Sequence, residues 1–303
     1  MAINGSPNGG SAYPAKPISI ITSGAGGSAD LAACVLAREL TLSLRQQVTV
    51  DNRASAIIPI DAVAAATPDG YTLLVSGGAL WIGPVLQNSP GRDVFRNFVP
   101  ITLATSAPNI LAVHPSLPVD SVAELIAYAR AHPGQIVYPA GVTGSSSHIA
   151  GELFNLMAGV GIVRAGYAST GRVVDELISG TVQLMFGLSS VIAPYLGTGK
   201  VRALAVTSAQ PSAVAPGLPT VAAAGLPGYE SETMIGLFAP AGTPSPIVET
   251  LNRECVRILR RPEIRDEIRS AGMDSVGNTS AEFADCLRSE LARLEKLRDR
   301  IKA

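Results

Sequence analysis

Hydrophobic residues in this chain gather in short β-branched runs that alternate with longer stretches of helical periodicity. The run at 18–22 predicts a strand, and helix-forming residues follow from Leu31 to Leu44. The alternation continues to residue 240, which predicts an α/β fold with a mostly parallel sheet. We expect further strands at 47–51, 71–75, 135–139, 162–167, 183–186, 201–207 and 236–240, with helices at 61–66, 121–131, 149–157, 172–178 and 191–196.

Two segments depart from that alternation. The apolar stretch at 101–114 is too extended for one compact unit and is broken at Pro108 and Asn109, so it could cross between domains. The segment 246–303 is helical and charged, with a capping box at Thr279 and Glu282. We expect its charged side chains to form a solvated face.

Two turns of small, hydroxyl-bearing residues, at 23–28 and 141–148, each lie between a predicted strand and a predicted helix. Such a turn leaves unpaired backbone N–H groups at the helix N-terminus, where the helix dipole also attracts anions. Neither turn adds the lysine of a phosphate site. Both therefore predict a carboxylate held between two domains by amides, hydroxyls and water. The alternative, that both turns only cap their helices, stays open.

The first turn also fits a dinucleotide-binding pattern, with Gly24, Gly26 and Ala29 in place and Asp51 at the end of the next strand. The acidic Asp30 speaks against this, because it falls in the first turn of the helix where a pyrophosphate would bind. An NAD-dependent dehydrogenase that uses the turn at 24–29 is therefore the alternative function.

Composition narrows the class of protein. Charged residues make up 16% of the 303 residues and the net charge is −1, so we expect no nucleic-acid partner. No apolar run approaches 18 residues, which excludes a membrane-spanning helix. The histidines and cysteines lack metal-ligand spacing, so we expect no metal, and we expect no cofactor.

Two features of the sequence relate to the cellular compartment of the protein: its first twelve residues and its cysteines. Residues 1–12 lack the apolar core of a signal peptide and are expected to be a leader or tag. The cysteines fall among helix-forming residues and suit small apolar core positions. In an oxidising compartment, a disulfide between Cys255 and Cys286 would instead join two C-terminal helices.

Short motifs from Tyr13 almost to the C-terminus together resemble one family, the Bug or TctC substrate-binding proteins of tripartite tricarboxylate transporters. The motifs are Tyr13-Pro14-x-Lys16-Pro17-Ile18, Gly26-Gly27-x-x-Asp30, Val50-x-Asn52-Arg53, Pro68-Asp69-Gly70-Tyr71-Thr72-Leu73-Leu74, Ser146-Ser147-His148-x-Ala150-Gly151-Glu152-Leu153-Phe154, Arg202-Ala203-Leu204-Ala205-Val206-Thr207-Ser208, Pro219-Thr220-Val221, Gly225-Leu226-Pro227-Gly228-Tyr229-Glu230 and Gly236-Leu237-Phe238-Ala239-Pro240-Ala241-Gly242-Thr243-Pro244.

The resemblance implies a two-domain periplasmic binding protein of type II, the Venus flytrap, with mixed, mostly parallel sheets and helices on both faces. We place domain 1 at 13–108 plus 229–303 and domain 2 at 109–228. The protein would not be an enzyme. It would be a periplasmic monomer, its native signal peptide absent here, that captures a small organic carboxylate and delivers it to membrane permease subunits. A sensor role without transport would use the same site.

Carried over by position, the family's ligand loops fall at 23–28, 55–58, 76–78, 143–147 and 167–170, and at residue 187. Arg164 or Arg172 could add positive charge. The expected ligand-binding residues are Ser23, Gly26, Gly27, Ser28, Ser55, Ala56, Ser76, Gly77, Trp81, Thr143, Ser145, Ser146, Ser147, Tyr167, Ser169 and Gly187.

Several of these positions depart from the family pattern. Gly187 stands where an aspartate is expected and Ala168 where a lysine is expected, which argues against an amino-acid ligand. Trp81, the only tryptophan, replaces a usual alanine. Its indole would offer a stacking face for an aromatic carboxylate as an alternative to a dicarboxylate, or would fill core space.

Overall fold

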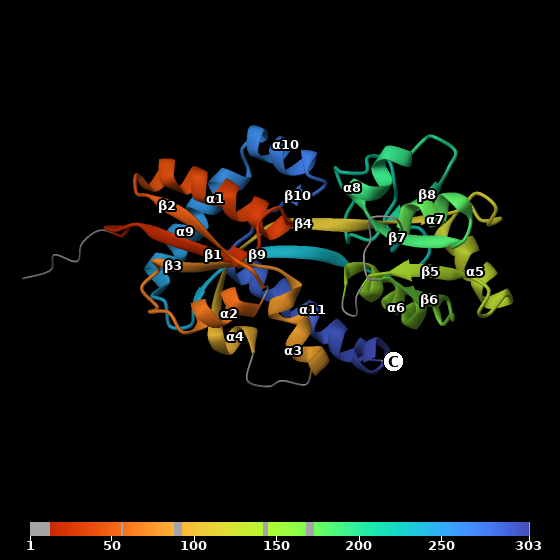
Figure 1. The fold of residues 1–303 in the computed structure, drawn as a ribbon, viewed down its shortest axis with the longest axis horizontal. Coiled ribbons are helices and arrows are strands. Elements are labelled where there is room, and N and C mark those ends of the chain that lie inside the picture. Colours follow the sequence, from red (N-terminus) through yellow and green to blue (C-terminus); the bar gives the residue numbers. More distant parts are fainter. Residues whose placement is uncertain (1–12, 56, 88–92, 142–144, 168–172, 303) are drawn as a thin grey trace, which may run out of the picture.

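The chain forms two groups of helices and strands that lie side by side along the long axis of the molecule (Figure 1). The structure, a computed structural model, describes residues 13–55, 57–87, 93–141, 145–167 and 173–302, without the side chains of 299–302. We call the group that begins the chain lobe 1 and the group between residues 109 and 231 lobe 2.

Lobe 1 is a sheet with helices on both faces. Within the first strand, Ile18 and Ile20 belong to one core cluster and Ile21 belongs to another, because successive side chains of a strand point to opposite faces. The elements are β1 (Ile18–Ser23), α1 (Ser28–Leu44), β2 (Val48–Arg53), α2 (Ile57–Ala64), β3 (Thr72–Ser76), η1 (Gly78–Leu80), α3 (Ile82–Gln87) and α4 (Val94–Asn97).

Two long strands connect the lobes. β4 (Phe98–Val113) leaves lobe 1 and β9 (Glu232–Pro240) returns to it, antiparallel to each other from Phe98 to Pro108. From Asn109 onwards β4 pairs instead with two strands of lobe 2. The apolar stretch broken at Pro108 and Asn109 is therefore a crossing strand, and it changes its pairing partners between these two residues.

Lobe 2 repeats the order of strand, turn and helix. A buried aromatic group lies at its centre, where the ring of Phe186 lies 6.0 Å from that of Tyr138 and 5.8 Å from that of Phe154. The elements are α5 (Val122–Ala131), β5 (Val137–Ala140), α6 (Ser146–Ala158), β6 (Val163–Gly166), α7 (Val173–Ser179), β7 (Leu184–Leu188), α8 (Ser189–Ile192), η3 (Ala193–Tyr195) and β8 (Arg202–Val206).

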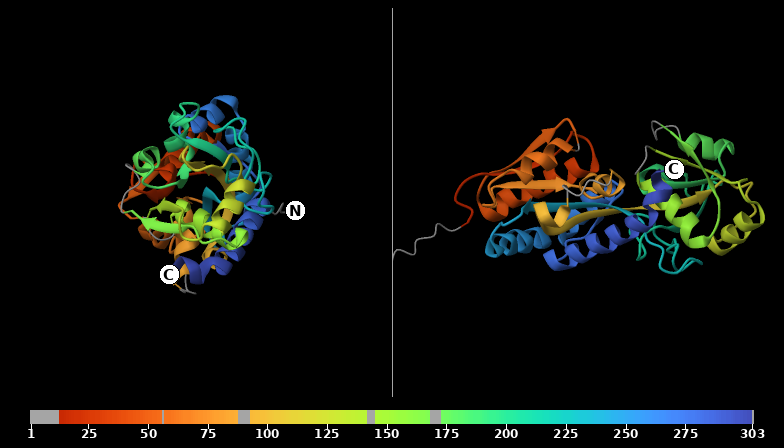
Figure 2. Two further views of the ribbon diagram at one scale, coloured as in Figure 1. Left: turned by 90° about the vertical axis from the view of Figure 1, so that its right-hand side faces the viewer. Right: turned by 90° about the horizontal axis from the view of Figure 1, so that it is seen from below.

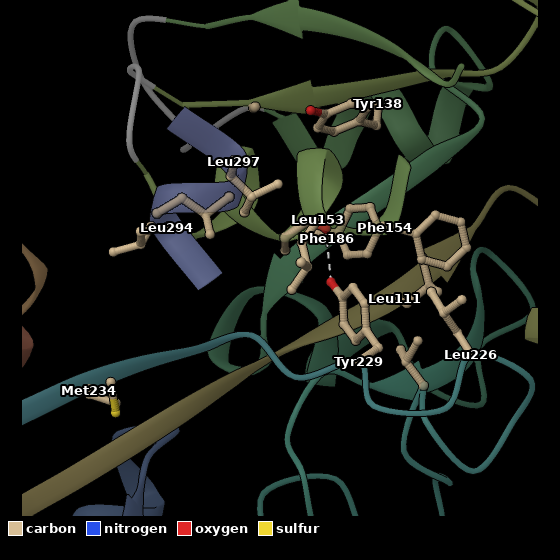
Figure 3. Close-up of a cluster of buried hydrophobic side chains, with 14 of the residues drawn as sticks. Leu111, Tyr138, Leu153, Phe154, Phe186, Leu226, Tyr229, Met234, Leu294 and Leu297 are labelled. Carbon is tan, nitrogen blue, oxygen red and sulfur yellow. Dashed lines mark hydrogen bonds between the residues drawn. The ribbon is translucent and has the colours of Figure 1, made fainter. Parts of the chain in front are cut away.

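The C-terminal segment packs first on lobe 1 and then reaches lobe 2. It contains α9 (Ser245–Leu259), α10 (Pro262–Ser270), β10 (Asp274–Ser275) and α11 (Ser280–Lys302). α11 runs along one side of the molecule towards lobe 2 and contacts α6 (Figure 2). Leu294 and Leu297 of α11 join the buried cluster around Phe154, where the Tyr229 hydroxyl donates a 2.9 Å hydrogen bond to the Ala150 carbonyl (Figure 3).

The observed elements confirm the predicted α/β class, but the expectation of mostly parallel sheets was wrong, because most of the described strand pairings are antiparallel. The sheets are mixed: β1 pairs in parallel with β2 and β3, and β5 with β6, while the described pairings of β4 and β9 are antiparallel. The capping box at Thr279 forms, since the Glu282 carboxylate accepts from the Thr279 N–H at 2.8 Å. Helix α2 begins at Ile57, four residues before the start predicted at residue 61.

The cysteine prediction needs a correction. Cys255 is buried in α9 and Cys286 is half-buried in α11, and both thiols are free. The core interpretation therefore holds for Cys255, and burial raises the pKa of its thiol to about 12.

Within the described residues, no helix is both long and apolar enough to span a bilayer, and no His, Cys, Asp and Glu side chains group into a metal site.

Candidate functional site

Each lobe has a pocket at the end that the crossing strands join to the other lobe. The lobe 1 pocket includes Ile235, close to where β9 enters that lobe. The lobe 2 pocket includes Asn109, where β4 enters lobe 2, and Leu188, which pairs with Asn109. Both pockets also lie at the C-terminal ends of strands, the usual place for ligands in open α/β sheets.

The lobe 1 pocket has a volume of about 240 Å³ and is lined by small residues. Ser23 ends β1, Ser76 ends β3, and Ser28 begins α1. Among the described residues, the lining is Ser23, Ser28, Ala29, Pro59, Val75, Ser76, Gly77, Gly78, Ala79 and Ile235, and none of these side chains is ionisable.

Asp30 occupies part of the anion-binding turn of lobe 1. Its carboxylate accepts a 2.7 Å hydrogen bond from the Gly26 N–H and another of 2.7 Å from the Asn52 side chain. The Gly26 hydrogen bond, followed by that from Asn52, lowers the pKa of Asp30 below its usual value. Gly26 adopts a φ of +88°, which favours glycine and points its N–H at Asp30. The predicted use of the Gly26 amide for a ligand is therefore corrected, because the chain's own carboxylate takes it.

The lobe 2 pocket, of about 210 Å³, combines an apolar wall with a serine turn. Its apolar side chains come from β5, α7, β7 and the helix that follows β7. Among the described residues, the lining is Asn109, Pro139, Ala140, Gly141, Ser145, Ser146, Ser147, Val173, Met185, Phe186, Gly187, Leu188 and Val191. As in lobe 1, none of these described lining residues is ionisable.

The serine turn begins α6 with its hydroxyls turned to one another. Ser145 is the N-cap residue but makes no side-chain capping bond; its hydroxyl lies 3.3 Å from that of Ser147, which accepts a 3.3 Å bond from the Gly141 N–H. The first turn of α6 contains no acidic residue. Its N-terminal amides and dipole are therefore not neutralised by a carboxylate of the helix itself.

A positive charge lies behind this turn. The Arg164 guanidinium donates to the Gly141 carbonyl at 3.3 Å and lies 3.1 Å from His148 Nε2. Burial, and then the charge of Arg164, lower the pKa of His148 to about 4, so this imidazole is neutral at pH 7. Arg164 is half-buried and places its guanidinium close to Gly141, which lines the pocket.

Asn109 is the functional candidate that the sequence patterns did not single out. Its side chain is 0% exposed, borders the lobe 2 pocket, and among the described residues finds no hydrogen-bond partner for either Nδ2 or Oδ1. Leaving such a group unpaired costs about 1–3 kcal/mol. The available signal was an amide side chain within an otherwise apolar run.

The structure brings eight of the expected residues to the two pockets, four to each. Ser55 instead accepts a 3.1 Å bond from the Ile57 N–H at the start of α2, while Gly26 and Gly27 are exposed beside the lobe 1 pocket. The pocket-lining group is Ser23, Ser28, Ser76 and Gly77 in lobe 1, and Ser145, Ser146, Ser147 and Gly187 in lobe 2. Ala56, Thr143 and Ser169 lie outside the described residues, as does Arg172.

Trp81 and Tyr167 need corrections. Trp81 is 2% exposed, and its ring lies 6.4 Å from that of Phe238 in the core, outside the lining of both pockets. The core interpretation therefore replaces the stacking one. Tyr167 does not line the lobe 2 pocket either, and its hydroxyl donates to the carboxylate of Glu176 in α7.

Sequence comparison connects the chain with one family of receptors. The family model described as tripartite tricarboxylate transporter family receptor, TctC, matches residues 32–302. Protein BugT from Bordetella pertussis is 34% identical over 286 residues, covering 93% of this chain and 88% of BugT.

Solved structures give the same connection. The R. palustris protein Rpa4515, described with adipate, is 31% identical with a TM-score of 0.73, over 95% of this chain and 98% of the other. MatC from Rhodopseudomonas palustris, described with bound malate, is 27% identical with a TM-score of 0.70, over 94% of this chain and 100% of the other.

Proposed function

Since the chain belongs to the TctC family of tripartite tricarboxylate transporter receptors, we propose that it captures a small organic carboxylate in the periplasm and delivers it to the membrane subunits of such a transporter. The family consists of substrate-binding receptors, and no catalytic step is proposed. The chain would act as a monomer, with domain 1 at 13–108 plus 229–303 and domain 2 at 109–228.

The observation that carries this proposal is the lobe 2 pocket. It presents the N-terminus of α6, three serine hydroxyls and a nearby guanidinium, with no acidic residue in the first helical turn. Such a site favours an anion through amides and hydroxyls. The relatives described with adipate and malate support a carboxylate as that anion, since both ligands are dicarboxylic acids.

The two pockets would cooperate through closure of the lobes. Each pocket lies at the end of its lobe where β4 and β9 cross to the other lobe. Two strands that cross between lobes can act as a hinge. Closure would place a second carboxylate, or the rest of the ligand, against the serines and glycines of lobe 1. Exclusion of water would strengthen the hydrogen bonds made by these uncharged donors.

The dehydrogenase alternative is disfavoured by the contacts at α1. A pyrophosphate at this turn would meet the Asp30 carboxylate, which holds the Gly26 N–H at 2.7 Å. A dinucleotide-binding turn needs that amide for its phosphates. The strand next to β3 in the sheet is β9, which is antiparallel to it, so the parallel sheet of a dinucleotide-binding domain does not continue beyond β3.

Calorimetry and thermal shift on protein refolded from denaturant, to remove any co-purified ligand, test the proposal. We expect at least one aliphatic dicarboxylate of four to six carbons to bind and to raise Tm, because a ligand of the folded state stabilises it. The matched diols, which lack the charge, should not bind. Binding of NAD without any carboxylate would contradict the proposal.

A further inference from the structure

Asn109 borders the lobe 2 pocket at the point where β4 enters lobe 2, and its side-chain amide is buried there. Both polar atoms of its amide are buried without a partner in the described part of the chain, and its residue is 0% exposed. A purely structural asparagine at such a position normally pairs its amide, because buried polar groups are hydrogen-bonded. A bound molecule in the adjoining pocket would supply the missing partners.

The backbone of Asn109 is held by one buried threonine. The Thr207 hydroxyl accepts from the Asn109 N–H at 2.7 Å and donates to the Asn109 carbonyl at 3.1 Å, and the Thr207 N–H donates to the same carbonyl at 2.9 Å. Thr207 is itself 0% exposed. This clamp fixes the backbone from which the amide side chain extends, so little entropy is lost when a ligand binds it.

The chemistry of the amide limits what it can recognise. Nδ2 donates and Oδ1 accepts, so full satisfaction needs a ligand group that does both. A carboxylate only accepts and would face Oδ1 with its negative charge. A hydroxyl group both donates and accepts.

The rest of the pocket fits a molecule with a hydroxyl and a short apolar chain. Val173, Met185 and Phe186 provide apolar wall, and the serine turn of α6 provides donors for a carboxylate. We propose that Asn109 is a specificity-determining residue that binds a ligand hydroxyl, and that the preferred ligands are hydroxy acids. This assignment rests on the proposed function, because it takes the carboxylate site as given.

The test compares two pairs of acids that differ by one hydroxyl: malate with succinate, and 3-hydroxyadipate with adipate. Calorimetry on the refolded wild type should show the hydroxy acid of at least one pair binding about tenfold more tightly, the amount expected for one well-made hydrogen-bonded group. Asn109→Leu, which keeps the branched side-chain skeleton but has no polar atoms, should bind both acids of that pair within about twofold of each other.

Two further variants separate recognition from a structural role. Ligand-free Asn109→Leu should have an unchanged or higher Tm, because it removes an unpaired buried amide, whereas a structural amide would lower Tm. Thr207→Val should weaken the hydroxy-acid preference because it removes the clamp, while Thr207→Ser, which keeps the hydroxyl, should retain it.

Equal binding of both acids in each pair by the wild type, or an unchanged preference in Asn109→Leu, would overturn the role of Asn109 and leave the proposed function standing. Failure of these four acids and of every other aliphatic dicarboxylate of four to six carbons to bind would overturn both.

Discussion

Two helices of this protein begin after turns of small residues, and only one of them carries its own acid there. In α1, Asp30 folds back on the turn and takes the Gly26 N–H. In α6, the first turn has no acidic residue, and Arg164 lies behind it instead. The two turns look alike as sequence patterns but differ in the charge that an approaching anion meets.

Whether a helix N-terminus can bind an anion depends on whether a side chain of the protein already accepts hydrogen bonds from its backbone amides. In lobe 1 the carboxylate of Asp30, four residues after Gly26, already binds the amide of the turn, so the turn acts largely as a cap. In lobe 2 the hydroxyls bond to each other and to Gly141, and the helix dipole is free to act on a ligand. We therefore assign the main carboxylate contact to lobe 2 and a supporting one to lobe 1.

An acidic residue in the first turn of α6 should weaken binding more than any other change proposed here. Ser146→Asp should weaken carboxylate binding at least about hundredfold, because like charges about 4 Å apart repel by several kcal/mol even at an intermediate dielectric. Folding should be unharmed, since an acid in the first helical turn is favourable. Calorimetry with the best-binding acid and Tm without ligand check both parts.

Ser28→Asp is the matched control in lobe 1. Ser28 also lies in a first turn and also lines its pocket, but it is exposed and two residues from the existing Asp30. Its effect on binding should be no more than several-fold. A larger loss in Ser28→Asp than in Ser146→Asp would reverse the assignment of the two lobes.

The next effect concerns the hinge that both pockets share. Burial, and then the carboxylate of Glu230, raise the pKa of Glu232 on β9 to about 7. Asp274 also raises it, while the Ser106 hydrogen bond and the Arg293 charge lower it. Because the folded state binds a proton more tightly than the unfolded chain, the free energy of unfolding should fall as pH rises from about 4.5 to about 7.

Glu232→Gln removes this titration. Urea unfolding should find the variant more stable than the wild type at pH 8, by on the order of 1–3 kcal/mol, and nearly equal to it at pH 4.5. The ranking of ligands should not change, since Glu232 lines neither pocket. A changed ranking would show that specificity is set at the hinge and not in the pockets.

Removal of the acid at the turn before α1 makes lobe 1 resemble lobe 2 and should change ligand binding the least. Asp30→Asn should destabilise the protein by about 1 kcal/mol at pH 7, because a neutral amide accepts the Gly26 and Asn52 bonds more weakly. The pKa of Asp30 is lowered by folding, so its stabilisation is present above pH 3.8 and is lost as pH falls further. The stability difference should therefore shrink in acid. Carboxylate binding should tighten at most a few-fold.

Much of the architecture follows from local patterns in the sequence. The β-branched runs, the capping box at Thr279 and the break at Pro108 and Asn109 were enough to predict the α/β order and a segment that crosses between domains, because each depends on neighbouring residues. The two small-residue turns were predicted for the same reason, and residues of both line pockets.

The remaining features depend on contacts between distant segments. The clamp on Asn109 comes from Thr207, almost a hundred residues later, so no local pattern could reveal it. The burial of Trp81 depends on Phe238 of the returning strand. The hydrogen bond from the Gly26 N–H to Asp30 depends on the positive φ of Gly26 and on the position of Asn52, which also binds Asp30. A sequence motif specifies neither of these.

The most direct test of the central claim is a titration of backbone amide chemical shifts in the deuterated, ¹⁵N-labelled protein with its best-binding carboxylate. The account predicts the largest saturable shifts at the amides of Ser146 and Ser147, with the Gly26 amide little changed because Asp30 holds it. Large shifts at Gly26 and its neighbours, with the amides of the α6 turn unmoved, would contradict it.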